Sequence, residues 1–197
     1  SYNVTFYRDP LRNSESDRLA YTKTLAEVIK LIESNGKTTV NDFWLKKDED
    51  GVWHFDSGSG SAAVEATRES QWRSNFYVNR IEEEDLYRTL VEKYRVLEAL
   101  GNDADEEMIV KVLALWQESR MNAFKPTPVT IAYDVGYETV SEVEVRSLDL
   151  PYEKHFPNLF SMNILFQINA SAFTDNGLRK KMLSLFEKDA AHVVGSD

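Results

Sequence analysis

The order of apolar patterns along the chain constrains its fold more than any other feature of the sequence. Segments that alternate like strands outnumber segments with helical spacing, and the two kinds do not follow one another regularly. A parallel sheet needs that regularity, because each parallel strand is reached through a crossover helix. The pattern therefore predicts an α+β fold with a mostly antiparallel sheet, an antiparallel helix pair in the middle and a C-terminal helix packed on the sheet.

The strand-like segments are rich in β-branched and aromatic residues and are bounded by turn residues. We expect strands at 2–8, 39–47, 51–56, 75–81, 129–135, 139–146 and 158–168. The second and third should form a hairpin, because Asp50-Gly51 between them tolerates the positive φ angles of a tight turn. The fifth and sixth should form another hairpin around Gly136. The last is the most apolar and should lie centrally in the sheet.

Helical spacing of apolar residues is clearest just after the first strand. We expect helices from about Ser16 to Gly36, over 82–100, over 105–120 and over 175–191, with a weaker candidate over 62–73. Gly101-Asn102 is so short a connection that the two middle helices should be antiparallel neighbours. The length of 197 residues suits a single α+β domain over 1–197, with a helical subdomain over 82–121 as the alternative.

Composition excludes several kinds of site. The chain has no cysteine, which removes disulfides, thiolate zinc sites, iron–sulfur clusters and cysteine nucleophiles. The three histidines, at 54, 155 and 192, are too few and too scattered for an imidazole metal cage. No apolar run approaches the ~20 residues of a spanning helix. We therefore expect a soluble cytoplasmic protein with no cofactor, no metal and no membrane contact.

The negative charge is concentrated in one region. The formal net charge is −10, and residues 1–80, 81–153 and 154–197 contribute −1, −10 and +1 respectively. Because phosphate contacts need a positive face, this balance argues against nucleic acid as a partner. An acidic region can instead steer the encounter with a basic protein surface. Solubility alone is the simpler explanation of the same charge.

These patterns predict a non-enzymatic protein-interaction, structural or assembly protein whose acidic region binds a protein partner with a basic surface. A second copy of the chain is another candidate partner. The mixture of arginine and aromatic residues at 71–80 should supply a second, smaller contact, because such residues are enriched at binding hot spots. The predicted contact residues are Glu82, Glu83, Glu84, Asp85, Asp103, Asp105, Glu106, Glu107, Trp72, Arg73 and Tyr77.

The main alternative is a metal-dependent hydrolase or nuclease. Its carboxylates would come from 82–85 or 103–107, or from His54 and Asp56, which share one face of a strand. Both acidic runs also stand at expected helix N-termini, where acids are favourable without any function. No sequence motif identifies catalytic residues, so the catalytic residues of such an enzyme stay unassigned.

A weaker alternative is a nucleotide-binding protein. Gly58-Ser59-Gly60-Ser61-Ala62-Ala63 fits a dinucleotide fingerprint, although its preceding strand belongs to an expected hairpin. Otherwise, the Ser/Gly run 57–61 should be a loop that does not pack.

Overall fold

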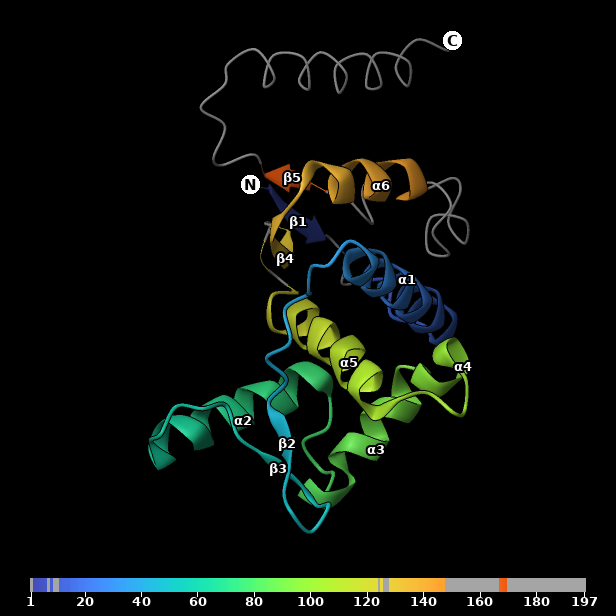
Figure 1. Ribbon diagram of the computed structural model, residues 1–197. Coiled ribbons are helices and arrows are strands. Elements are labelled where there is room, and N and C mark those ends of the chain that lie inside the picture. The colour runs from blue at the N-terminus through green and yellow to red at the C-terminus, as the bar shows by residue number, and fades with distance from the viewer. Residues whose placement is uncertain are drawn as a thin grey trace.

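Two small antiparallel sheets lie at opposite ends of a set of helices in the described part of the chain (Figure 1). The computed structural model describes residues 2–6, 8, 11–123, 125, 128–147 and 167–169. The elements are, in chain order, β1 (Tyr2–Phe6), α1 (Glu15–Ser34), β2 (Leu45–Lys47), β3 (Trp53–Phe55), α2 (Ala62–Phe76), α3 (Glu83–Lys93), α4 (Val96–Leu100), α5 (Glu106–Met121), β4 (Val129–Val135), α6 (Tyr137–Ser147) and β5 (Gln167–Asn169). The predicted α+β class with antiparallel sheets is confirmed.

The larger sheet has the order β4-β1-β5, and β1 is antiparallel to both neighbours. The first strand of the chain is therefore the central one, and β5 lies at an edge of the described sheet. Of the segment 158–168, which was predicted to be central, only the last two residues are described, and they stand in this edge strand; the rest of that prediction lies outside the described residues. The last described helix, α6, packs on β1. The helix predicted over 175–191 lies outside the described residues.

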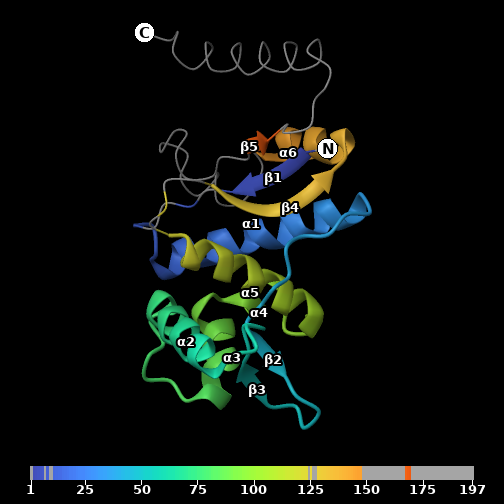
Figure 2. The same cartoon turned by 90° about the vertical axis from the view of Figure 1, so that its left-hand side faces the viewer.

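The smaller sheet is the predicted hairpin, with shorter strands. Leu45 faces Phe55 and Lys47 faces Trp53, and Gly51 has a φ of 82° in the turn between them. In both views the hairpin and the larger sheet lie at opposite ends, with α1 and α5 between them (Figure 2). None of the helices in the described ranges is long and apolar enough to cross a membrane.

The N-terminal helix α1 has the boundaries that its sequence indicates. Ser14 and Asp17 form a capping box, in which each side chain accepts a hydrogen bond from the other's main-chain N–H, at 3.2 and 2.9 Å. Gly36 follows the helix with a φ of 70°. The predicted helix and its stop are confirmed.

Residues 139–146 form a helix rather than the predicted second strand of a hairpin. Thr139, Val140 and Val143 are buried at helical spacing, and Glu142 and Arg146 form an i,i+4 ion pair at 2.9 Å. Their β-branched side chains favour a strand locally. A strand here would place Val140 and Val143 on opposite faces, whereas the helix buries both. The hairpin partner expected for β4 is therefore replaced by β1.

The predicted strand 75–81 is also absent from the structure. Its first residues complete α2, and Tyr77 then takes a left-handed conformation with a φ of 56°. Trp72 and Phe76 lie one helical turn apart and are both fully buried. The helix thus places both aromatic rings in the core, which explains why the apolar residues at 76 and 78 do not mark an alternating strand.

The helix expected over 82–100 is divided into α3 and α4. The carbonyl of Lys93 accepts a hydrogen bond from Arg18 Nε at 2.8 Å, and that of Tyr94 accepts from Thr22 Oγ1 at 2.6 Å. A continuous helix would use these two carbonyls internally. Because side chains of α1 take them, the chain turns at Arg95, whose φ is 53°.

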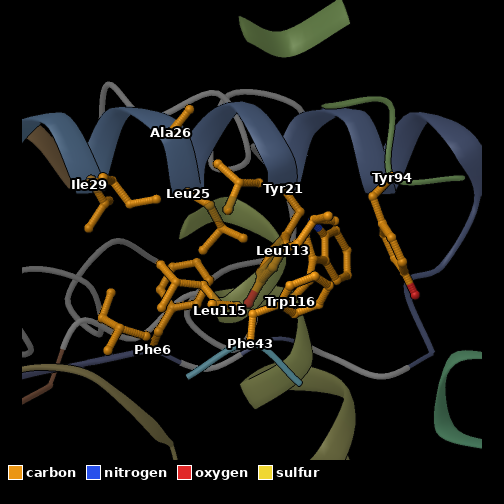
Figure 3. Close-up of a cluster of buried hydrophobic side chains, with 14 of the residues drawn as sticks. Phe6, Tyr21, Leu25, Ala26, Ile29, Phe43, Tyr94, Leu113, Leu115 and Trp116 are labelled. Atoms are coloured by element: carbon orange, nitrogen blue, oxygen red, sulfur yellow. The ribbon is translucent and has the colours of Figure 1, made fainter. Parts of the chain in front are cut away.

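A continuous series of aromatic rings links the two sheets through the core. Its members are Phe6, Tyr21, Trp116, Tyr94, Phe76, Trp72 and Phe55, with consecutive ring centroids 4.1–5.8 Å apart. Figure 3 shows the first four of these residues, all on the same side of α1. The series runs from β1 to β3, so packing in the core fixes where the hairpin stands relative to the rest of the molecule.

Candidate interaction surface around the β2–β3 hairpin

The two acidic runs that the sequence singles out meet at the β2–β3 hairpin. Glu83, the first residue of α3, lies 3.4 Å from His54 Nδ1, and its other oxygen accepts a hydrogen bond from the Phe55 N–H at 2.8 Å. Glu106, the first residue of α5, pairs with Lys47 at 2.9 Å. One hairpin therefore brings together the starts of two helices that are separated in sequence.

His54 lies between two carboxylates. Its Nε2 is 2.8 Å from Asp48 of the turn, on the opposite side of the ring from Glu83. These two hydrogen bonds raise the pKa of His54 above its ordinary value. The pKa of Asp48 is lowered, first by the Val52 N–H and then by His54. The imidazole thus ties the turn to the start of α3.

This contact predicts a pH-dependent stability. A histidine with a raised folded-state pKa stabilises fully below its unfolded value, about 6.5, and loses that contribution as the pH rises through the folded-state value. We expect the urea concentration at the denaturation midpoint to decrease as the pH is raised from about 6 to about 8. The decrease should be smaller in His54→Gln. Urea titrations across this range measure the difference.

The His54 prediction has an internal control. Asp48 acts in a separate, more acidic window, because a lowered carboxyl pKa gives stability that is lost as the pH falls. Glu83→Gln should also reduce the loss of stability between about pH 6 and pH 8, since it removes one of the two carboxylate charges beside the imidazole. An unchanged slope in both variants would contradict the role assigned to His54.

Aromatic stacking fixes the hairpin against α3. The rings of Trp53 and Tyr87 lie 4.0 Å apart and within 8° of parallel, and Lys47 Nζ lies 5.8 Å from the Trp53 ring centroid. Burial, and then the nearby Glu106 carboxylate, raise the pKa of Tyr87 to about 12. The surface around the hairpin is therefore held by packing as well as by ion pairs.

Some of the carboxylates here have no cation beside them. Asp85 pairs with Arg88 and Glu107 with Lys111, whereas Glu82, Glu84 and Asp103 are exposed and form no ion pair with the described residues. We name the whole set the acidic face. Its members are Asp48, Glu49, Asp50, Glu82, Glu83, Glu84, Asp85, Asp103, Asp105, Glu106 and Glu107.

The second predicted contact, at Trp72, Arg73 and Tyr77, is not a single surface. Trp72 is fully buried and donates its Nε1–H to Gln117 at 2.9 Å, so it has no surface to offer a partner. Arg73 is half-buried and pairs with Glu69 at 2.7 Å. Tyr77 is 66% exposed. The segment is a helix end rather than a strand, which is why only one of the three residues is well exposed.

The glycine-rich run at 57–61 is a loop, as predicted, with Gly58 and Gly60 exposed, and its serines are hydrogen-bonded to the protein itself. Glu65 of α2 accepts hydrogen bonds from the Ser57 and Ser59 N–H groups at 2.8 and 2.9 Å, and from the Ser57 hydroxyl at 2.6 Å. The serine hydrogen bonds lower the pKa of Glu65 to about 2. A phosphate would need these same N–H groups. The nucleotide-binding alternative therefore has no support in this loop.

The metal-dependent alternative also gains no support from the geometry. No group of three or more His, Asp or Glu side chains in the described ranges is placed to hold a metal ion. Asp56 accepts a hydrogen bond from the Gly58 N–H at 2.8 Å, whereas His54 pairs with Asp48 and Glu83. The carboxylates lie along an exposed surface rather than around one point.

Comparison with known protein families, with curated proteins and with solved structures finds no match for this chain. The charge and geometry of the chain itself are therefore the basis on which a function is proposed.

Proposed function

We propose that this protein is a non-enzymatic interaction domain that binds a protein partner with a basic surface through the acidic face. The observation that carries the proposal is the meeting of two acidic helix starts on one hairpin, through the Glu83–His54 and Glu106–Lys47 contacts. Complementary charge of this kind speeds association and selects partners.

Helix stability alone does not account for this arrangement. Acids in a first turn stabilise their own helix through its dipole, wherever that helix lies. The dipole does not require two such helix starts to share one hairpin, nor the turn between its strands to be acidic at 48–50. Glu82, Glu84 and Asp103 also retain oxygens that can accept from a partner's arginine, often as bidentate pairs.

The surface is also preorganised for binding. The Trp53–Tyr87 stack and the Glu83 hydrogen bond to Phe55 hold the hairpin on α3 before a partner arrives. Ordering of loops and side chains is a main cost of association, and a surface already in place avoids part of it.

A charge-neutralised variant tests the proposal. We expect Glu82→Gln/Glu84→Gln/Asp103→Asn to bind a fluorescent oligoarginine peptide about tenfold more weakly, because three unpaired charges are removed from one surface. Fluorescence anisotropy measures the dissociation constant. For the unmodified protein, affinity should fall as salt is raised, since the contact is exposed.

The matched control removes the same charge elsewhere. Glu15, Glu27 and Glu138 are exposed acids outside the acidic face, and Glu15→Gln/Glu27→Gln/Glu138→Gln has the same net charge as the test variant. It should bind the peptide nearly as well as the unmodified protein. Equal weakening in both variants would show attraction to net charge alone and would overturn the proposal.

A further inference from the structure

Three basic side chains meet at the opposite ends of the helices that carry the acidic face. Lys93 is the last residue of α3 and Arg120 stands in the last turn of α5, while Arg18 reaches them from the first turns of α1. Lys93 Nζ lies 5.4 Å and Arg120 Cζ 5.2 Å from the ring centroid of Tyr77. Arg18 Nε donates to the Lys93 carbonyl at 2.8 Å.

These cations have no carboxylate beside them. Arg18, Lys93 and Arg120 form no ion pair with any residue of the described chain, although the protein has 33 acidic residues. Burial, and then the charges of Arg18 and Arg120, lower the pKa of Lys93 to about 8. No carboxylate of the described fold therefore offsets the repulsion among the three.

Helix capping explains only part of the arrangement. Arg120 Nε donates to the Asn75 carbonyl at 2.9 Å, and Lys93 Nζ donates to the Phe76 carbonyl, both in the last turn of α2. Such bonds satisfy carbonyls that a helix end leaves free. A carbonyl carries no net charge, however, and each bond occupies one donor of its cation. Donors and positive charge remain for a ligand.

The site is open on the side of Tyr77. The Tyr77 ring is 66% exposed, whereas Arg120 is only 4% exposed and so has a fixed position at the base of the cluster. The terminal nitrogens of Arg120 donate to no described protein atom. Fixed guanidinium donors beside an ammonium group are the chemistry that binds phosphate oxygens.

We propose that Arg18, Lys93 and Arg120, bordered by the Tyr77 ring, bind a phosphate group. The bound anion neutralises the repulsion among the cations and accepts hydrogen bonds from donors that the protein leaves unused. The phosphate is either free or the ester of a small molecule. In the second case, an organic substituent can pack on the exposed Tyr77 ring.

Titration of the unmodified protein tests the site directly. We expect inorganic phosphate to give saturable NMR shift changes at the amides of 77, 93 and 120, and to raise the pKa of Lys93 from about 8. Phenyl phosphate binds more tightly than phosphate if Tyr77 contacts the ester group, and equally if the phosphate alone is recognised. Shift changes reproduced by sodium chloride at the same ionic strength would overturn the proposal.

A matched pair of lysine variants adds a second test. Lys93→Met should weaken phosphate binding about tenfold, because one charge-assisted contact is lost. Lys30→Met removes the same charge from an exposed position of α1 and should leave phosphate binding unchanged. Arg18→Met should weaken binding in the same way as Lys93→Met. Equal affinities in all variants would assign these cations to helix capping alone and would overturn the site.

Discussion

Replacing Trp116 with alanine is expected to lower the free energy of unfolding by about 4 kcal/mol. Trp116 is fully buried, and its ring lies 4.5 Å from that of Tyr21 and 4.1 Å from that of Tyr94. Its Nε1–H donates to Thr22 Oγ1 at 3.0 Å. The substitution leaves a cavity in the middle of the aromatic series that connects the two sheets. Urea denaturation followed by circular dichroism measures the loss.

A phenylalanine at the same position separates the ring from its hydrogen bond. Trp116→Phe keeps an aromatic side chain and loses the indole N–H, so a cost of about 1–2 kcal/mol is expected. If Trp116→Ala lowered the free energy of unfolding no more than Trp116→Phe does, the ring contacts with Tyr21 and Tyr94 would contribute little. That result would contradict a stabilising role for the aromatic series.

Local patterns predicted the elements whose core face follows one clear period. The α5 helix is an example, because Val112, Leu115 and Trp116 recur at helical spacing and are all buried. The hairpin followed from Asp50-Gly51 between two apolar segments. In each case the residues that decide the structure are close together in sequence.

The incorrect predictions share a physical cause. In 139–146, the β-branched residues and spaced glutamates resemble a strand, whereas the burial of Val140 and Val143 together requires a helix. The interruption after Lys93 depends on Arg18 and Thr22, which lie more than seventy positions earlier in the chain. Neither partner is visible in a local window, so tertiary contacts override the local preference.

The candidate site likewise has one feature that the sequence predicted and another that it did not. The sequence identified the acids of 82–85 and 103–107, because charge can be counted. Their meeting at the hairpin depends on pairs such as His54–Glu83 and Lys47–Glu106, 29 and 59 positions apart. The cation cluster gave no stronger signal than basic residues in the last turns of two helices, a pattern that capping alone explains.

Gln117→Leu is expected to destabilise the protein by about 3 kcal/mol, although it adds apolar surface to the core. The Gln117 side chain is buried, and its Oε1 accepts from Trp72 Nε1 and from the Trp44 main-chain N–H, both at 2.9 Å. Its Nε2 donates to the Asp42 carbonyl at 2.5 Å. One amide thus joins α5 to α2 and to the segment that leads into β2.

The cost arises because leucine leaves the partners of Gln117 without their hydrogen bonds. The indole N–H of Trp72 is sealed from water, so it cannot find a substitute partner in the folded state. A double-mutant cycle with Trp72→Phe isolates this pair, since the second change removes the stranded donor. Denaturant titrations of the four proteins should show the double variant at least about 1 kcal/mol more stable than the sum of the single effects predicts. Strict additivity would mean that the Trp72–Gln117 hydrogen bond does not stabilise the fold, and that shape alone fixes α2 against α5.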